Sequence, residues 1–148
     1  MKKNIDAFFS SPAYAVVGVS ESGKKFGNSA YRAMKERGLK VFPVHPRLKT
    51  VEGDACFKSV LDLPPEVRSV VTVVPPQQTE LVIGDCIRKE ITAIWMQQGS
   101  QSAKAIADAA SHGIRVVHGE CIMMFLEPVR SIHTFHRWIN RIVGRYPN

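Results

Sequence analysis

The sequence lacks the features that mark secreted and membrane proteins. It has only three cysteines, Cys56, Cys86 and Cys121, and an odd number of widely spaced cysteines argues against a disulfide framework. No apolar run approaches the roughly 18 residues that a membrane span needs. Two lysines near the N-terminus are not followed by the apolar segment of a secretory signal. We therefore expect a cytoplasmic protein that does not contact a membrane.

The sequence also lacks the marks of a nucleic-acid-binding protein, although its formal net charge is +7. A basic balance favours an anionic partner, which can be nucleic acid, a membrane surface or a phosphorylated small molecule. The basic residues do not form one long block, and no aromatic-rich RNA-binding motif is present. We therefore expect a small nucleotide ligand and no nucleic acid.

Repeats, linkers and low-complexity segments are absent too, and apolar strand patterns alternate with helical patterns. Continuous apolar runs are typical of strands buried on both faces, which favours a parallel sheet. The alternation predicts one Rossmann-like α/β domain over residues 1–148, with a doubly wound, mainly parallel sheet and helices on both faces. The predicted strands are 14–19, 39–44, 69–74, 93–96 and 115–118. The predicted helices are 4–12, 28–37, 77–89, 102–112 and 129–143.

The helical patterns also predict local details. Asn28 or Ser29 is expected to cap the second helix, and Gly38 is expected to follow its C-terminus. Residues 50–68 are less regular, with a helical turn over 59–63. Helix 77–89 is expected to turn three apolar side chains inward, Leu81, Ile83 (or Val82) and Ile87.

The last predicted helix, 129–143, is amphipathic and has a basic face. It is expected to pack on the sheet, and the alternatives are a homodimer contact or a contact with an anionic surface. His133 and His136 lie three residues apart on this helix, but no third metal ligand is evident. We therefore expect no metal site.

The stretch after the first strand predicts a phosphate-binding turn, because small residues lead from a buried strand into a helix. Gly18, Gly23 and Lys24 nearly match the P-loop pattern, but Lys25 stands where that pattern needs a hydroxyl for Mg²⁺. No aspartate ends a neighbouring strand, so hydrolysis of a nucleoside triphosphate is disfavoured. Ser20 replaces the second glycine of the dinucleotide fingerprint. The alternative is that the glycines only shape the turn.

The end of the second strand lacks the carboxylate of an NAD site. It reads His45-Pro46-Arg47, and no acidic residue appears before Glu52. Basic groups here suit a nucleotide with an additional ribose phosphate, which NADP(H) and coenzyme A both carry. The loop at Val74-Pro75-Pro76 offers an apolar wall for an adenine or a pantetheine arm, and the loop at 97–99 offers amides. All four loops follow strand ends that meet at one edge of an open α/β sheet.

No acid–base pair is evident in this crevice, so we expect no catalytic residue. Cys121 follows the last strand and could lie near the thiol of a ligand or act as a nucleophile. The alternative is a buried or half-buried free thiol.

The chain resembles the small CoA-binding-domain proteins related to the CoA-binding domain of the succinyl-CoA synthetase α-subunit. The resemblance covers roughly residues 13–127. It is carried by 15–20 with Lys25 and the following helix to 38–46, by Trp95-Met96-Gln97-Gln98-Gly99, and by the segment around Cys121. It implies a Rossmann-like fold and a CoA site across Gly18–Ser20, Lys25, His45-Pro46 and Val74-Pro75.

The sequence departs from the family pattern at three places. His45 replaces the usual asparagine, Ile122 replaces the usual proline after the cysteine, and Val74-Pro75-Pro76 replaces a more polar stretch. The synthetase's phosphorylated histidine lies in another domain, so the resemblance does not extend to ligase activity.

The hypothesis is therefore a non-catalytic protein that binds coenzyme A or an acyl-CoA, as a sensor or accessory protein. The alternatives are an NADP-linked oxidoreductase and a protein whose turn binds nothing. The expected ligand-binding residues are Gly18, Val19, Ser20, Lys25, Gly27, Asn28, His45, Pro46, Arg47, Val74, Pro75, Gln97 and Cys121.

Overall fold

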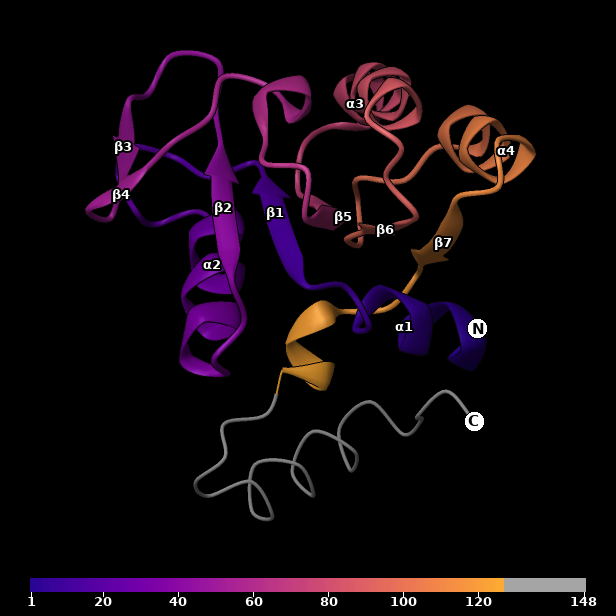
Figure 1. Ribbon diagram of the computed structural model, residues 1–148, viewed down its shortest axis with the longest axis horizontal. Coiled ribbons are helices and arrows are strands. Elements are labelled where there is room, and N and C mark those ends of the chain that lie inside the picture. The colour runs from indigo at the N-terminus through magenta and orange to yellow at the C-terminus, as the bar shows by residue number, and fades with distance from the viewer. Residues whose placement is uncertain (127–148) are drawn as a thin grey trace.

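The protein is built on a five-stranded parallel sheet with the strand order β2-β1-β5-β6-β7. The structure is a computed structural model, and it describes residues 1–126 (Figure 1). The strands are β1 Ala13–Val17, β2 Val41–Val44, β5 Val67–Thr72, β6 Ala93–Met96 and β7 Arg115–His118. This topology confirms the predicted α/β class. The helix expected at 129–143 lies outside the described residues, and so do its two histidines and the homodimer contact suggested for it.

Helices cover both faces of the sheet, as predicted. Helices α1 and α2 and the short 3₁₀ helix η2 pack on one face, and α3, α4 and the 3₁₀ helix η1 pack on the other (Figure 1). None of the helices within residues 1–126 has the length and apolar character to cross a membrane. Their bounds are α1 Lys2–Phe8, α2 Phe26–Glu36, η1 Val60–Asp62, α3 Pro76–Arg88, α4 Ala103–Ser111 and η2 Ile122–Phe125.

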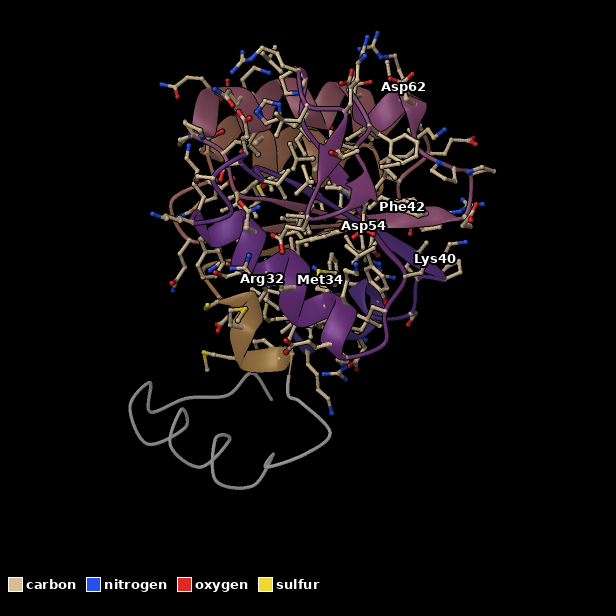
Figure 2. The ribbon with its side chains drawn as sticks, turned by 90° about the vertical axis from the view of Figure 1, so that its left-hand side faces the viewer. Arg32, Met34, Lys40, Phe42, Asp54 and Asp62 are labelled. Carbon is tan, nitrogen blue, oxygen red and sulfur yellow. The ribbon has the colours of Figure 1, made fainter. Side chains whose placement is uncertain are left out.

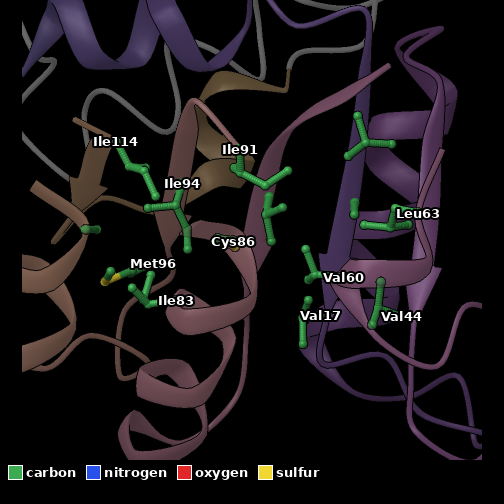
Figure 3. Close-up of a cluster of buried hydrophobic side chains, with 14 of the residues drawn as sticks. Val17, Val44, Val60, Leu63, Ile83, Cys86, Ile91, Ile94, Met96 and Ile114 are labelled. Atoms are coloured by element: carbon green, nitrogen blue, oxygen red, sulfur yellow. The ribbon is translucent and has the colours of Figure 1, made fainter. Parts of the chain in front are cut away.

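Strand β1 shows why the apolar runs are continuous. All five of its residues are buried, and alternate side chains enter different cores. Ala13, Ala15 and Val17 join the core under α3 and α4, part of which Figure 3 shows. Tyr14 and Val16 join the core under α1 and α2. A strand between two helical layers has no polar face, which explains the pattern.

A two-stranded hairpin lies beyond β2, where the sequence predicts only irregular chain. It consists of β3 (Thr50–Val51) and β4 (Asp54–Ala55). Its two-residue turn has positive φ angles at Glu52 (51°) and Gly53 (84°), as type I′ turns require. The helical turn predicted at 59–63 is confirmed as η1, and the Ser59 side chain caps it.

Two predicted details of the helices are wrong. Helix α2 begins at Phe26 with Lys25 as its N-cap, so neither Asn28 nor Ser29 caps it. Leu81 of α3 is 75% exposed. Ile83 is buried as predicted and Ile87 is partly buried against the same core, while Thr79 and Cys86 complete the inner face in place of Leu81. The prediction of Gly38 is confirmed, because it follows α2 with a φ of +89°.

Candidate functional site

The strand order creates a topological switch point at the carboxyl ends of β1 and β5. From β1 the chain moves to β2 on one side, and from β5 it moves to β6 and β7 on the other. Ligands of open α/β sheets bind in the crevice at such a point. The turn after β1 and the segment after β5 both lie here, as the sequence analysis predicts.

Two glycines let three pieces of backbone meet at this point. A Cβ atom on Gly18 would lie 2.4 Å from the carbonyl oxygen of Val73, and the φ of Gly18 is +125°. A Cβ atom on Gly27 would lie 2.3 Å from the carbonyl oxygen of Gly18. The turn after β1 is therefore pressed between the end of β5 and the start of α2, which only glycine permits.

The N-termini of α2 and α3 are both left without a side-chain cap. Lys25 and Pro75 are the N-cap residues, neither side chain accepts a hydrogen bond there, and neither first turn is acidic. Helix α4 differs, because the hydroxyl of Ser102 accepts from the N–H of Ala105 at 3.0 Å. The first N–H groups of a helix have no intrahelical acceptor. The uncapped start of α2 therefore offers donors and a positive helix end to an anion.

Asn28 fixes the turn after β1 by hydrogen bonds to Ser20. Its side chain is fully buried, and its Oδ1 accepts from the N–H of Ser20 at 2.8 Å and from the Ser20 hydroxyl at 2.9 Å. Its Nδ2 donates to the carbonyl oxygen of Ser20 at 3.1 Å. The predicted site residue Asn28 thus shapes the turn, because its amide forms hydrogen bonds with both the N–H and the carbonyl oxygen of Ser20. The Ser20 hydroxyl also lies 3.1 Å from that of Ser22.

The end of β2 brings His45 and the basic residue Arg47 to the same edge. The Nδ1 of His45 accepts from the N–H of Arg47 at 3.0 Å and from that of Leu48 at 3.3 Å. Partial burial lowers the pKa of His45, and so do the charges of Arg47 and Lys25, while Glu21 opposes them. Lys25 lies in the turn after β1, so this turn and the loop after β2 lie within electrostatic reach of each other, as predicted. Pro46 lies exposed between His45 and Arg47.

We expect the imidazole of His45 to titrate below about 6.5, the usual value for histidine. Unfolded chains then bind the proton at higher pH than folded ones. The contribution of His45 to the free energy of unfolding should therefore be greatest above about pH 6.5. It should fall as the pH decreases toward the lowered pKa of His45. An NMR titration of the His45 ring and urea unfolding across this pH range measure both effects. The variant His45→Asn should flatten the pH dependence, since an amide oxygen can accept the same two N–H bonds without titrating. A pKa at or above 6.5 in the free protein would contradict this assignment.

The loops that follow β5 and β6 form a cavity of about 360 Å³. Val73 lines it and also packs against Gly18 at the switch point, so one wall of the cavity adjoins the turn after β1. The predicted residues Val74 and Pro75 line it as well. The full lining is Val73, Val74, Pro75, Pro76, Gln98, Gly99 and Ser100.

A buried row of hydroxyl groups supports this cavity. The Ser100 hydroxyl lies 2.6 Å from that of Thr79 and donates to that of Thr72 at 2.9 Å. These three residues are almost completely buried, and the row ties the end of β5 to the start of α3. Sequence reasoning missed it, because isolated Ser and Thr residues carry no pattern of their own.

The predicted residues Gln97 and Cys121 lie where β6 meets η2. Gln97 is 5% exposed, and its Oε1 accepts from the N–H of Ile122 at 3.0 Å. The indole N–H of Trp95 donates to the carbonyl oxygen of Glu120 at 3.1 Å. These bonds fix the segment that carries Cys121, a half-buried free thiol. Gln98, the next residue, lines the cavity in place of Gln97.

Over residues 1–126, no three His, Cys, Asp or Glu side chains are grouped so that they could hold a metal ion. Basic side chains (Lys25 and Arg47) and apolar ones (Val74 and Pro75) lie around the crevice, with the acidic Glu21 near His45. Together with the uncapped helix ends, the sheet topology is that of the doubly wound α/β class, whose ligands bind at the switch point.

The family follows from the comparison with known proteins. The model of the CoA binding domain family matches residues 12–127, and the chain belongs to this family. This match confirms the resemblance drawn from the strand–turn–helix at Gly18, the Trp95–Gly99 segment and the segment around Cys121.

Two curated relatives are acetate–CoA ligases. The α-subunit of the ADP-forming acetate–CoA ligase II of Pyrococcus furiosus is 29% identical over 129 residues, which covers 80% of this chain and 28% of the relative. The ADP-forming acetate–CoA ligase I of Archaeoglobus fulgidus is 26% identical over 143 residues, which covers 90% of this chain and 21% of the relative. This chain therefore spans about a quarter of the length of these relatives.

Solved structures share the fold in two contexts. A conserved hypothetical protein of Pyrococcus furiosus is 31% identical with a TM-score of 0.73, covering 76% of this chain and 97% of that one. The apo form of a dinucleotide forming acetyl-coenzyme A synthetase 1 of Ca. Korarchaeum cryptofilum is 28% identical with a TM-score of 0.64, covering 72% of this chain and 25% of that one. The fold thus occurs in a chain of similar extent and within a longer synthetase.

Proposed function

We propose that the protein binds coenzyme A or an acyl-CoA in the crevice between the ends of β1 and β5. The observation that carries the proposal is the turn from Gly18 into the uncapped start of α2, in a chain that belongs to the CoA binding domain family. Its free N–H groups suit the diphosphate of CoA. Lys25 and Arg47, which both act on His45, suit the additional ribose phosphate.

The cavity beyond the turn suits the rest of the ligand. Its walls at Val74, Pro75 and Pro76 are apolar, and its volume is about 360 Å³, which fits a flexible chain of the size of pantetheine. Cys121 would then be a neighbour of the thiol end or a structural thiol. We further propose that the protein acts as a single domain in a non-catalytic role, because the crevice combines donors and apolar walls and the sequence offers no acid–base pair for it among residues 1–126.

The test is calorimetric titration with CoA, acetyl-CoA, dephospho-CoA and NADPH. We expect CoA to bind and dephospho-CoA to bind about 10–150-fold more weakly, since one charge-assisted contact is worth about 1.5–3 kcal/mol. Lys25→Ala and Arg47→Ala should each weaken CoA and leave dephospho-CoA almost unchanged.

Lys40→Ala is the matched control for charge. Lys40 precedes β2 at the opposite end of the sheet, where it pairs with Glu66 at 2.7 Å, so the variant loses the same charge far from the crevice. It should bind CoA like the wild type. An absence of CoA binding at millimolar concentration would reject the proposal, and tighter binding of NADPH would favour the oxidoreductase alternative.

A further inference from the structure

The tip of the β3–β4 hairpin contacts α2. This helix begins at the turn after β1, residues 18–27, which is called the phosphate turn below because we propose that it binds the diphosphate. One carboxylate oxygen of Glu52, Oε2, accepts from the Nδ2 of Asn28 at 3.1 Å and from the Nη1 of Arg32 at 2.8 Å. Asn28 and Arg32 lie one turn apart on α2, so a single oxygen atom joins two side chains of the same helix face. Figure 2 shows the hairpin, with Asp54 labelled, close to α2, with Arg32 labelled.

Both side chains continue from Glu52 into the turn after β1. Asn28 binds the N–H, the hydroxyl and the carbonyl oxygen of Ser20. The Nη1 of Arg32 donates to the carbonyl oxygen of Gly23 at 3.1 Å. Glu52 is therefore linked to the turn at Ser20, near its beginning, and at Gly23, in its middle. Its hydrogen-bonded links to both residues run through Asn28 and Arg32.

The backbone at Glu52 gives a second and independent observation. Its φ of +51° is left-handed, a conformation that asparagine, aspartate and glycine adopt more readily than glutamate. The turn alone would favour Asn-Gly at positions 52 and 53. A glutamate here works against the turn and supplies a side chain long enough to reach Asn28 and Arg32.

We propose that Glu52 is a positioning residue for the phosphate turn, which it holds in the binding conformation through Asn28 and Arg32. The proposal rests on the proposed function, because it assigns Glu52 a part in binding the diphosphate of CoA. A turn that is already ordered binds without the cost of ordering, and a turn that is ordered only part of the time binds more weakly in proportion to that fraction.

The decisive comparison is between Glu52→Asn and Glu52→Gln. Both variants remove the same negative charge. Asparagine favours the turn but is one methylene too short to reach Asn28, whereas glutamine keeps the reach and an oxygen acceptor. We expect Glu52→Asn to weaken CoA binding about tenfold with no loss in the midpoint of urea unfolding. Glu52→Gln should stay within about twofold of the wild type.

A second measurement does not need the ligand. The N–H of Ser20 is protected by Asn28, so its hydrogen exchange in the free protein reports how firmly the turn is held. We expect this exchange to rise about tenfold in Glu52→Asn and to stay near the wild-type rate in Glu52→Gln.

Asp54→Asn is the matched control on the same hairpin. Asp54 pairs with Lys35 and accepts a hydrogen bond from Tyr31, both on α2 but away from the turn. It should change neither CoA affinity nor the exchange of Ser20. Equal effects of Asp54→Asn and Glu52→Asn would overturn the proposal in favour of general hairpin docking. Unchanged exchange and affinity in Glu52→Asn would overturn it as well.

These results separate the two proposals. If the wild-type protein does not bind CoA, the proposed function fails, and the exchange of Ser20 still decides whether Glu52 positions the turn. If the wild-type protein binds CoA and Glu52→Asn binds equally well, the proposed function stands and the role of Glu52 fails.

Discussion

Replacing Gly18 by alanine is expected to reduce the free energy of unfolding by about 3–5 kcal/mol and to abolish CoA binding. Two costs combine at this position. The φ of +125° is strained for any residue with a Cβ, and that atom would lie 2.4 Å from the carbonyl oxygen and 2.8 Å from the carbonyl carbon of Val73. Both are backbone atoms of the strand end beside β1, so relief requires the turn to move away from β5.

The movement of the turn explains why binding should be lost with stability. Gly27 packs against the carbonyl oxygen of Gly18, so a displaced turn also shifts the start of α2 and its free N–H groups. Urea unfolding measures the stability, and calorimetry at a temperature where the variant is folded measures the binding.

Gly84→Ala is the matched control, because it adds the same methyl group inside α3 where nothing lies within 4 Å. It should stabilise the protein by about 0.5–1 kcal/mol, the helix preference of alanine over glycine. A Gly18→Ala variant as stable as the wild type would show that the turn does not press against Val73.

The conformation of the turn after β1 could be predicted from the sequence because its requirements are local. A buried strand, a glycine with positive φ and a helix start follow one another within a few residues, and each has its own residue preference. The same holds for Gly38 at the end of α2 and for the strands, whose apolar runs follow from burial between two helical layers. The inner face of α3 was predicted only in part, since Leu81 and Ile83 are both apolar but lie two positions apart, so a helix can bury only one of them.

The hydrogen bonds that Asn28, Arg32 and Glu52 form around the turn could not be predicted, because they join residues that are distant in the sequence. Asn28 and Glu52 are 24 positions apart, and Asn28 looks like a helix cap in the sequence because capping is the commonest use of asparagine near a helix start. Glu52-Gly53, between Thr50-Val51 and Asp54-Ala55, does match a two-residue hairpin. The two strands are so short that this signal is weak. The absence of an acidic residue before Glu52 favours a ligand with an additional phosphate, but nothing in the sequence places Glu52 beside Asn28.

Asn28→Leu is expected to cost about 3 kcal/mol of the free energy of unfolding and to weaken CoA binding. Leucine has the same branched skeleton and is not smaller, so the loss does not come from a cavity. It comes from the N–H and carbonyl oxygen of Ser20, which lose their partners, and from Glu52, which loses one donor. A partly buried polar group without a partner costs about 1–3 kcal/mol. Leucine at the neighbouring position, Ser29→Leu, keeps every bond of Asn28 and should cost much less.

Asn28→Asp separates the two halves of the amide. Aspartate keeps the acceptor for Ser20 but turns a carboxylate toward Glu52 and toward the carbonyl oxygen of Ser20, in place of a donor. Two carboxylates at this distance share one proton, which raises the apparent pKa of the pair above the unfolded values of about 4. The stability of this variant should therefore be highest below about pH 4 and fall as the pH rises through the raised pKa of the pair. The deficit of Asn28→Leu should not shrink in this way at acid pH, since leucine does not titrate. Urea unfolding of both variants from neutral to acid pH measures the contrast. Parallel curves would mean that Asn28 contributes by packing alone, and that the donor from Asn28 to Glu52 does not help to hold the phosphate turn.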